Sequence, residues 1–540
     1  MRGARAAALA ALPLFVLAPT TMASAQPERH ALLFLVEKLT FDRALSDQSI
    51  GALARAGGIG LMTNAGPLDL FREPEGPTQP GPLSRLTRVW LGSRDTAVIA
   101  HVLRDLDGEV LAIVAGRGGR EGVATPLILA RGQSDELLAI DGEPSGLTSE
   151  TTRREGVVSN VDLEPTIRAF LGAPAGRGPG STIRIEGEAP TELAERYEEW
   201  RRSVAPVGVT VLVVALTSLA VALVMIGARW SGPARAVAVW VLFSEAMLVA
   251  LLPAGLLPDL RTAVVLPAVT VLAAVLTAAA LAVGRGSAPR PIAVVGGVGL
   301  GVVVLDAAFG WPLGVTPFLG GSALEGVRFF GLGNPSAGIV LSGAVLAAAF
   351  LRPWAGVALL LGAGLFAGLP FLGADLGGGL AMFAAAAVWY ALRVRGRFGW
   401  REVGLAVAAL VAGAAVLVVV HTALPSPATH VARAVEGAGP IDLLGVFADR
   451  LRANLEATST VPAAWLAVVG LPAWLVVIWR RPGAFRAPLD ADEAWRHAAA
   501  TLALGGMLGY VLNDTHAMAA VAFVFVSAAV VIPSLRWMND

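Results

Sequence analysis

Residues 325–336 read Glu-Gly-Val-Arg-Phe-Phe-Gly-Leu-Gly-Asn-Pro-Ser, which sets an arginine and two glycines directly ahead of an apolar window. Asn334 suits a helix cap, and the proline after it suits the first helical turn. Free backbone amides at a helix N-terminus, with an arginine beside them, can hold an anion. The sequence therefore predicts an anion-binding site formed by Arg328, Gly331, Gly333 and Asn334. A capped helix with an arginine at the lipid interface explains the same pattern, and both interpretations stay open.

Four further ionisable residues lie near the ends of other apolar windows, on the same side of the predicted membrane: Asp306, Asp375, His421 and Asp514. Charged side chains inside a membrane are costly, so they tend to face a cavity or one another. These residues are candidates for acid–base catalysis or for binding a cation. Helix capping also accounts for Asp375 and Asp514. We expect the three aspartates to converge with Arg328 and Asn334 on one outward-facing cavity.

Glu245 lies deeper, near the middle of its apolar window. A carboxylate at that depth must be paired or neutralised. The sequence is compatible with a buried, hydrogen-bonded glutamate and also with a proton or ion relay.

Apolar windows of about 20 residues, the length that crosses a bilayer, recur along the C-terminal two thirds of the chain. We count about eleven of them, at 204–227, 236–257, 262–283, 291–309, 335–350, 354–372, 376–392, 403–422, 462–479, 498–512 and 516–535.

The connecting loops differ in arginine content. The loops on one side hold Arg229, Arg235, Arg285, Arg290, Arg352, Arg393, Arg395, Arg397, Arg401, Arg480, Arg481, Arg486 and Arg496. Those on the other side hold Arg261, Arg328, Arg433, Arg450 and Arg452. By the positive-inside rule, this asymmetry predicts that Arg328 lies outside the cell and the C-terminus in the cytoplasm.

The overall composition agrees with a membrane protein. The 540 residues are 55% hydrophobic and only 15% charged, and the mean hydropathy is +0.67. Because 41 basic residues balance 41 acidic ones, no global field points to a nucleic-acid partner. The chain has no cysteine, which excludes disulfides, thiolate metal sites and cysteine nucleophiles.

The chain divides into five predicted parts. Residues 1–25 resemble a signal peptide, since two arginines precede a short apolar run that ends in Ala-Ser-Ala. An α/β domain outside the cytoplasm follows over residues 26–190. Residues 191–203 form a charged linker helix, residues 204–535 form the all-α membrane domain, and residues 536–540 form a cytoplasmic tail.

Within residues 26–190, short continuous apolar runs at 31–36, 110–114 and 126–130 are typical of buried parallel strands. Helical patterns lie at 47–56, 96–106 and 162–171. The last of these opens with an aspartate cap and closes at Gly172.

Three passages of this domain resemble the alkaline-phosphatase superfamily. They are Leu-Leu-Phe-Leu-Val-Glu at 32–37, the strand, loop and strand over 111–132, and Gly-Val-Val-Ser-Asn-Val-Asp-Leu-Glu-Pro-Thr at 156–166. The resemblance implies a reduced α/β fold of that family, with Glu37 at a metal-binding position and Thr63 as a candidate nucleophile. Gly116 and Arg117 stand where the family has an Asp-His pair, and they cannot hold a divalent cation. We therefore expect a degenerate, inactive phosphatase-like site without metal or other cofactor.

The leading hypothesis is a multi-pass plasma-membrane protein of bacterial envelope biogenesis. It would bind an anionic substrate at the outer face, either a membrane lipid or a lipid-linked phosphate or glycan. The combination of both domains also resembles a group of bacterial envelope membrane proteins without an assigned activity. A secondary transporter or lipid flippase is one alternative, because of Glu245 and the Gly/Pro-interrupted windows. An envelope scaffold is another.

Overall fold

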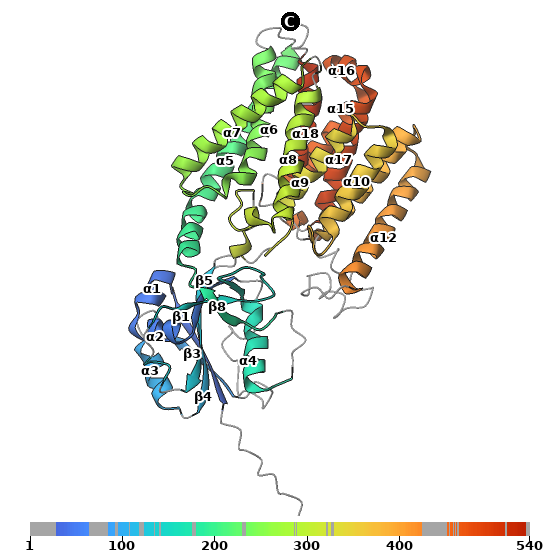
Figure 1. The fold of residues 1–540 in the computed structure, drawn as a ribbon. Coiled ribbons are helices and arrows are strands. Elements are labelled where there is room, and N and C mark those ends of the chain that lie inside the picture. Colours follow the sequence, from blue (N-terminus) through green and yellow to red (C-terminus); the bar gives the residue numbers. More distant parts are fainter. Residues whose placement is uncertain are drawn as a thin grey trace, which may run out of the picture.

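The computed structural model describes residues 29–63, 85–91, 96–106, 108–117, 124–133, 136–139, 142–174, 180–228, 234–285, 287, 289–319, 322–325, 329–423, 451–452, 454–456, 458, 461, 464–513 and 516–535. The predicted signal peptide and C-terminal tail lie outside these residues. The described chain forms an α/β domain followed by a helical domain, with the α/β domain at one end of the helices (Figure 1).

The α/β domain is built on one eight-stranded mixed sheet in the order β3-β1-β4-β5-β2-β6-β8, with β7 paired to β2. The strands are β1 (Arg29–Glu37), β2 (Gly58–Thr63), β3 (Leu86–Leu91), β4 (Glu109–Arg117), β5 (Thr125–Gln133), β6 (Ser145–Thr148), β7 (Val157–Ser159) and β8 (Arg184–Glu188). Strand β1 pairs in parallel with β3 and β4, as the sequence predicts for the first two apolar runs.

The third strand that the sequence predicts to be parallel, β5, is antiparallel to its neighbours, so this prediction is wrong. It pairs antiparallel with both β4 and β2. A parallel connection needs a crossover of a dozen residues or more, whereas only residues 118–124 separate β4 from β5. Burial on both faces makes β5 as continuously apolar as a parallel strand, so its composition does not reveal its direction.

Helices cover both faces of the sheet (Figure 1). They are α1 (Phe41–Ser46), α2 (Gln48–Ala56), α3 (Ala97–Arg104) and α4 (Leu163–Leu171). In β1, Leu32, Phe34 and Val36 join one buried cluster. Leu33 and Leu35 join a second cluster on the opposite face. The predicted helix ends are confirmed at Asp47, whose side chain caps α2, and at Gly172, which closes α4 with a φ of 67°.

One continuous helix connects the two domains. Helix α5 (Thr191–Ala228) contains 38 residues, about 57 Å at 1.5 Å per residue. It includes both the charged linker predicted at 191–203 and the first apolar window, with Pro206 inside the helix. The two predicted segments are therefore one rigid element.

The helical domain continues with α6 (Ala234–Ala254), α7 (Thr262–Val283), α8 (Pro289–Ala308), α9 (Asn334–Ala348), α10 (Pro353–Gly368), α11 (Leu376–Trp389), α12 (Trp400–Ala423), α15 (Leu471–Arg480), α16 (Arg486–Ala491), α17 (Glu493–Leu512) and α18 (Ala517–Ser534). Two π-helical turns, Tyr390–Val394 and Leu466–Gly470, adjoin α11 and α15.

Within the described part of the chain, seven helices are long and apolar enough to cross a membrane, fewer than the eleven predicted. The other windows became shorter helices, such as Asn334–Ala348 and Pro353–Gly368, or the more polar α17. A helix of 15 residues extends only about 22 Å, less than the ~30 Å hydrocarbon core. Helix α10, for example, ends at Gly368, two residues before Pro370.

Small residues let the central helices approach closely. A Cβ added at Gly343 of α9 would lie 2.3 Å from the carbonyl oxygen of Gly296 in α8. Such contacts between glycines are typical of helix packing in membranes. Helices α11 and α18 are mostly buried in the domain, whereas α12 is mostly exposed, with an apolar surface that suits lipid.

Candidate functional site

The described residues of the predicted outer site lie at the end of the helical domain that faces the α/β domain (Figure 1). Asp375 is the N-cap of α11, Asp306 is near the end of α8, and His421 is near the end of α12. The prediction that Asn334 caps its helix is wrong by one residue, because Gly333 is the N-cap of α9 and Asn334 is its first residue. Arg328 and Asp514 lie outside the described residues, so their part in the predicted convergence stays a prediction.

Asp306 organises the loop that follows α8. Its carboxylate oxygen Oδ1 accepts the backbone N–H of Leu313 at 2.8 Å, and its carbonyl accepts the N–H of Trp311 at 2.8 Å. The side chain is 8% exposed. Asp306 therefore has a structural role as the acceptor that closes residues 306–313 into a compact turn.

Asp375 joins two helices. One of its carboxylate oxygens accepts the N–H of Gly378 in the first turn of α11 at 3.2 Å. The other accepts from the Asn513 side chain, at the end of α17, at 3.4 Å. The amide of Asn454 in turn donates to the carbonyls of Tyr510 and Asn513 at 2.8 and 2.7 Å. This buried polar network explains Asp375 as a helix cap that also fixes α17.

The loop that carries Gly331 and Gly333 lies against the loop before Asp375. The N–H of Leu332 donates to the carbonyl of Gly373 at 2.7 Å. Gly331 has a φ of 86°, and a Cβ there would lie 2.4 Å from the same carbonyl oxygen. A Cβ at Gly378 would likewise lie 3.3 Å from that of Ala337. The first turns of α9 and α11, which carry Asn334 and Asp375, are therefore neighbours.

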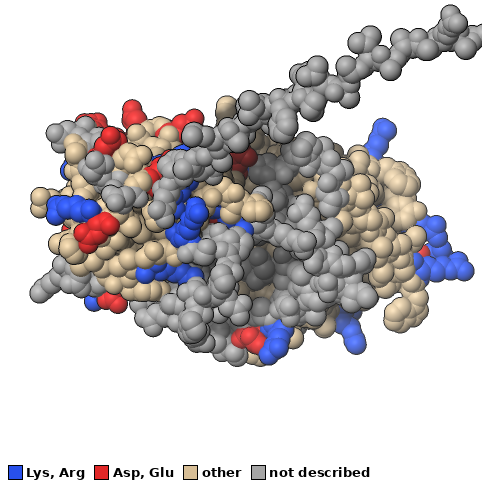
Figure 2. Space-filling view, turned by 90° about the horizontal axis from the view of Figure 1, so that it is seen from below, with Lys and Arg blue, Asp and Glu red and all other residues tan. Residues whose placement is uncertain are grey.

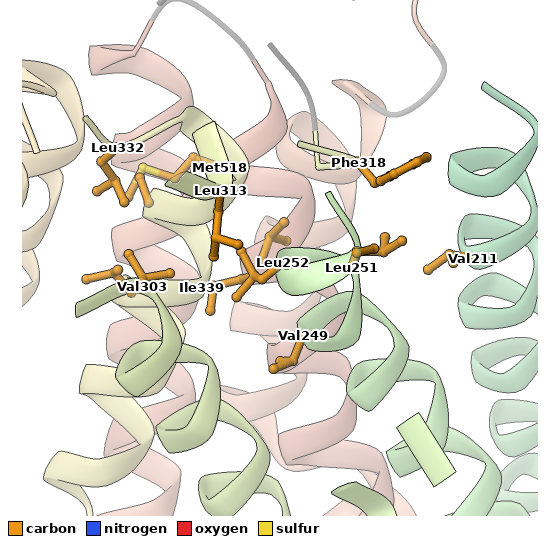
Figure 3. Packing of buried hydrophobic residues seen from close by; sticks show 14 of the residues in the cluster. Val211, Val249, Leu251, Leu252, Val303, Leu313, Phe318, Leu332, Ile339 and Met518 are labelled. Atoms are coloured by element: carbon orange, nitrogen blue, oxygen red, sulfur yellow. The ribbon is translucent and has the colours of Figure 1, made fainter. Parts of the chain in front are cut away.

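A small cavity lies beside this junction. Its volume is about 40 Å³, room for a few water-sized groups. Its lining combines apolar side chains from α6 and α8 with the polar residues Asp306 and Ser336, and with Gly331 and Gly333. Figure 3 shows Leu252, Val303, Leu313 and Ile339 near one another in the buried cluster, and the first three of them also line the cavity. The cavity thus has an apolar floor and a polar side next to the start of α9.

Two adjacent arginines of the α/β domain contact the loops that follow α8 and precede α9. The Arg154 guanidinium donates to the carbonyls of Trp311 at 2.7 Å and Phe329 at 3.0 Å. The Arg153 guanidinium lies 4.0 Å from the centre of the Phe330 ring, a cation–π contact. Burial lowers the pKa of Arg154, and the negative charge of Asp306 opposes that shift. The α/β domain therefore places positive charge close to the cavity.

The arginine pair lies in the loop between β6 and β7, which buried hydrogen bonds anchor. The Thr152 hydroxyl, fully buried, donates to the carbonyl of Val157 at 2.6 Å. Asp162 accepts the N–H groups of Ser159 and Ser181 at 2.9 and 3.0 Å. Burial raises the pKa of Asp162, while hydrogen bonds from nearby hydroxyls and N–H groups lower it. These buried bonds hold the loop in one conformation.

The first turns of α5 also connect the two domains. The Tyr197 hydroxyl accepts the N–H of Ala124 in the α/β domain at 3.3 Å. Trp200, 1% exposed, donates from its indole to the carbonyl of Pro317 at 3.0 Å. Glu199 accepts the N–H of Leu260 at 3.1 Å. Trp200 is therefore buried against the loop after α8, where it joins α5 to that loop.

His421 lies apart from the cavity lining. Its Nε2 is 2.9 Å from the carbonyl oxygen of Gly368, a contact that joins the ends of α12 and α10. Like Asp306 and Asp375, it has a backbone partner that accounts for its position.

The four residues of the predicted phosphatase-like site lie along one edge of the sheet. Glu37 and Arg117 are paired neighbours at the ends of β1 and β4, and Thr63 ends β2. Glu37 is exposed, whereas Thr63 is fully buried, with its hydroxyl 3.4 Å from the carbonyl of Val158. A Cβ at Gly116 would lie 2.9 Å from that of Thr125, so no larger side chain fits there without rearrangement. In the described residues, no three His, Cys, Asp or Glu side chains group as metal ligands.

Sequence reasoning did not identify Arg153 and Arg154. The sequence feature that marks them is a pair of arginines directly after two threonines, between two short strands. Only the docking of the domains shows which surface they meet. In the comparisons with known proteins, no family model, curated protein or solved structure matches this chain.

Proposed function

We propose that this protein binds an anionic, lipid-linked phosphate or glycan at the outer face of the plasma membrane, beneath its α/β domain. The observation that carries the proposal is the docking of Arg153 and Arg154 over the cavity at the start of α9. Arginine forms strong, directional hydrogen bonds with phosphate. A helix N-terminus adds backbone amides that favour an anion.

The shape of the site supports an amphipathic ligand. Leu251, Leu252 and Val303 form an apolar part of the lining within α6 and α8, and the lining also contains Trp311 and Phe330, which Arg154 and Arg153 of the α/β domain contact. The cavity accommodates only a small polar group, so a lipid tail would lie along the apolar surface of the helices. The predicted orientation places this end of the domain outside the cell.

We further propose that the protein binds this ligand without hydrolysing it. Asp306, Asp375 and His421 all have backbone partners that explain their positions. The phosphatase-like edge carries a glycine and an arginine in place of metal ligands. The α/β domain would then cover or present the bound headgroup. On the visible described face in Figure 2, basic and acidic side chains are interspersed over this domain, so the visible charge there has no single sign.

A binding assay tests the proposal. The full chain in nanodiscs of zwitterionic lipid is titrated with a short-chain isoprenyl phosphate. Arg328→Gln and Arg154→Met should each weaken binding about tenfold or more, because each removes a charged hydrogen-bond donor. Arg184→Gln and Arg261→Gln, exposed arginines elsewhere on the same half of the molecule, should bind like wild type. Equal affinity in all five proteins would exclude this site.

A second candidate function, proton-coupled transport of the same ligand, has one observation in its favour. Glu245 is fully buried within α6, and neither carboxyl oxygen has a hydrogen-bond partner among the described residues. Intramembrane carboxylates of this kind often belong to proton relays. Proteoliposomes loaded with a pH-sensitive dye test it. Ligand-driven proton flux that Glu245→Gln abolishes would favour transport, and absence of flux would leave binding alone.

A further inference from the structure

A tryptophan in an unusual backbone conformation forms part of the wall of the cavity at the start of α9. Trp311 has a φ of 64°, in the left-handed region, directly after Gly310 with a φ of 80°. Bulky side chains are rarely found in this region. Trp311 lines the cavity and is buried. Strain of this kind persists only where the surrounding structure maintains it, and it is concentrated at ligand clamps and switch regions.

Both domains hold Trp311 in this conformation. Its N–H donates to the carbonyl of Asp306 at 2.8 Å, and its carbonyl accepts the N–H of Gly314 at 3.1 Å. The shorter bond to that carbonyl, at 2.7 Å, comes from the Arg154 guanidinium of the α/β domain. If the α/β domain moves away, this bond is lost. The position of Trp311 therefore depends on the docking of the α/β domain.

The Trp311 side chain closes the cavity on the side of α10. Its ring centre lies 6.1 Å from that of Phe366, and the two ring planes are tilted by 35°. Phe366 is half-buried, near the end of α10. Packing holds two aromatic rings at this separation together, so the rings can move apart without the loss of a hydrogen bond between them.

The surface beyond this ring pair is apolar and exposed. Phe309, two residues before Trp311, is 78% exposed, and Leu365, next to Phe366, is exposed as well. Phe371, in the turn after α10, is 57% exposed. Exposed apolar patches of this kind suit contact with a membrane. The ring pair therefore lies between a cavity with polar lining and a surface that suits lipid.

We propose that Trp311 and Phe366 form a lateral gate through which a lipid headgroup enters the cavity from the membrane, between the ends of α8 and α10. With the α/β domain docked, Arg154 holds Trp311 against Phe366 and the gate is closed. When Arg154 is released, the Trp311 backbone leaves the left-handed region and the ring moves away from α10. The open gate also gives a lipid tail a path out of a cavity of only about 40 Å³. That the entering lipid is the anionic ligand rests on the proposed function.

Labelling of a single cysteine tests the gate without any ligand. Ser336→Cys, in the cavity lining, is introduced into the full cysteine-free chain in nanodiscs. N-cyclohexylmaleimide dissolves in the bilayer, whereas a sulfonated maleimide stays in water. Trp311→Ala should speed labelling by N-cyclohexylmaleimide at least about fivefold, because loss of the ring lowers the cost of local opening. Labelling by the sulfonated reagent should change by less than about twofold, since the route from water is not altered.

Further variants separate gating from misfolding. Phe366→Ala opens the pair from α10 and leaves Trp311 in place, so it should speed labelling equally if Trp311→Ala folds poorly. Phe398→Ala removes a ring from a similar pair, 6.5 Å from Trp479 at the opposite end of the domain. This matched control should label like the Ser336→Cys parent. Arg154→Met should also speed labelling, because it frees the Trp311 carbonyl.

The gate is overturned if neither Trp311→Ala nor Phe366→Ala speeds labelling by N-cyclohexylmaleimide. It is also overturned if the sulfonated reagent gains equally, since the opening would then lead to water. An unchanged rate in Arg154→Met would reject control by the α/β domain. Faster labelling without binding of isoprenyl phosphate keeps the gate and rejects the ligand, whereas binding with unchanged labelling keeps the ligand site and rejects the gate.

Discussion

Removing the Arg154 guanidinium should loosen the loops after α8 and before α9. Arg154→Met keeps the aliphatic stem and deletes the donors to the carbonyls of Trp311 and Phe329. A hydrogen bond from a charged donor contributes about 1.5–3 kcal/mol. Two bonds at the lower limit give about 3 kcal/mol, and water replaces part of that at a half-buried position, so we expect a loss of about 2 kcal/mol in local stability.

Hydrogen exchange on the full chain measures this loss directly. The informative amides are Leu313, Gly314 and Leu332, which lie in these two loops and donate to the Asp306 carboxylate and to the carbonyls of Trp311 and Gly373, respectively. A loss of about 2 kcal/mol corresponds to exchange about 30-fold faster. Arg184→Met, in which an exposed arginine with only exposed ion pairs is changed, serves as control. If the three amides exchange at the wild-type rate in Arg154→Met, the arginine does not hold the domains together and the docking argument fails.

Three further predictions concern pH, backbone and burial. The hydrogen bond from Arg131 chiefly lowers the pKa of Glu109 below its ordinary value of 4.5, with burial opposing and Arg29 contributing. Because the folded pKa is the lower one, Glu109 stabilises the fold above pH 4.5 and that stability is lost as pH falls through the folded pKa. Unfolding midpoints of wild type and Glu109→Gln should therefore converge in acid, and a constant difference would contradict this. Gly331→Ala should lower Tm by the equivalent of about 1–3 kcal/mol, since it adds a Cβ 2.4 Å from a carbonyl oxygen at positive φ. Gly310→Ala, with a φ of 80° and open space, should cost less, and equal losses would mean that φ alone matters. Glu245→Gln should leave Tm unchanged or raise it, because an unpartnered buried carboxyl is costly. A marked fall in Tm would reveal an ionic partner.

Local patterns predicted most of the elements well. The apolar run of β1, the helix that starts at Asp47 and the helix end at Gly172 follow from side-chain chemistry within a few residues, and they stand where the sequence placed them. The cap predicted at Asp162 is wrong, because its carboxylate accepts from Ser159 and Ser181 and makes no cap hydrogen bond to α4. Each apolar window became a helix, but a window does not show where its helix begins and ends. Seven described helices are long and apolar enough to cross a membrane, against eleven predicted windows, because three windows formed apolar helices of 10–17 residues and α17 is more polar.

The candidate site was less predictable because its contacts link distant parts of the chain. Asp375 follows the cap pattern expected from sequence, but its second partner, Asn513, is 138 residues away. The carboxylate of Asp306 closes a turn through Leu313, a role that its depth in the membrane does not indicate. Arg154 meets Phe329 across 175 residues and two domains. Hydrophobic periodicity relates residues that are close in sequence, so it could not predict that contact.

The central claim is that a phosphate-bearing lipid occupies the cavity at the start of α9. It is tested most directly by a photoreactive probe on a single cysteine in this cysteine-free chain. Ser336→Cys places the probe in the cavity lining, and Val304→Cys, 44% exposed on α8, places it on the apolar outer surface. After irradiation in native membranes, mass spectrometry should find an isoprenyl-linked or glycan-linked phosphate at position 336 and bulk phospholipid at position 304. The same bulk phospholipids at both positions would contradict the account.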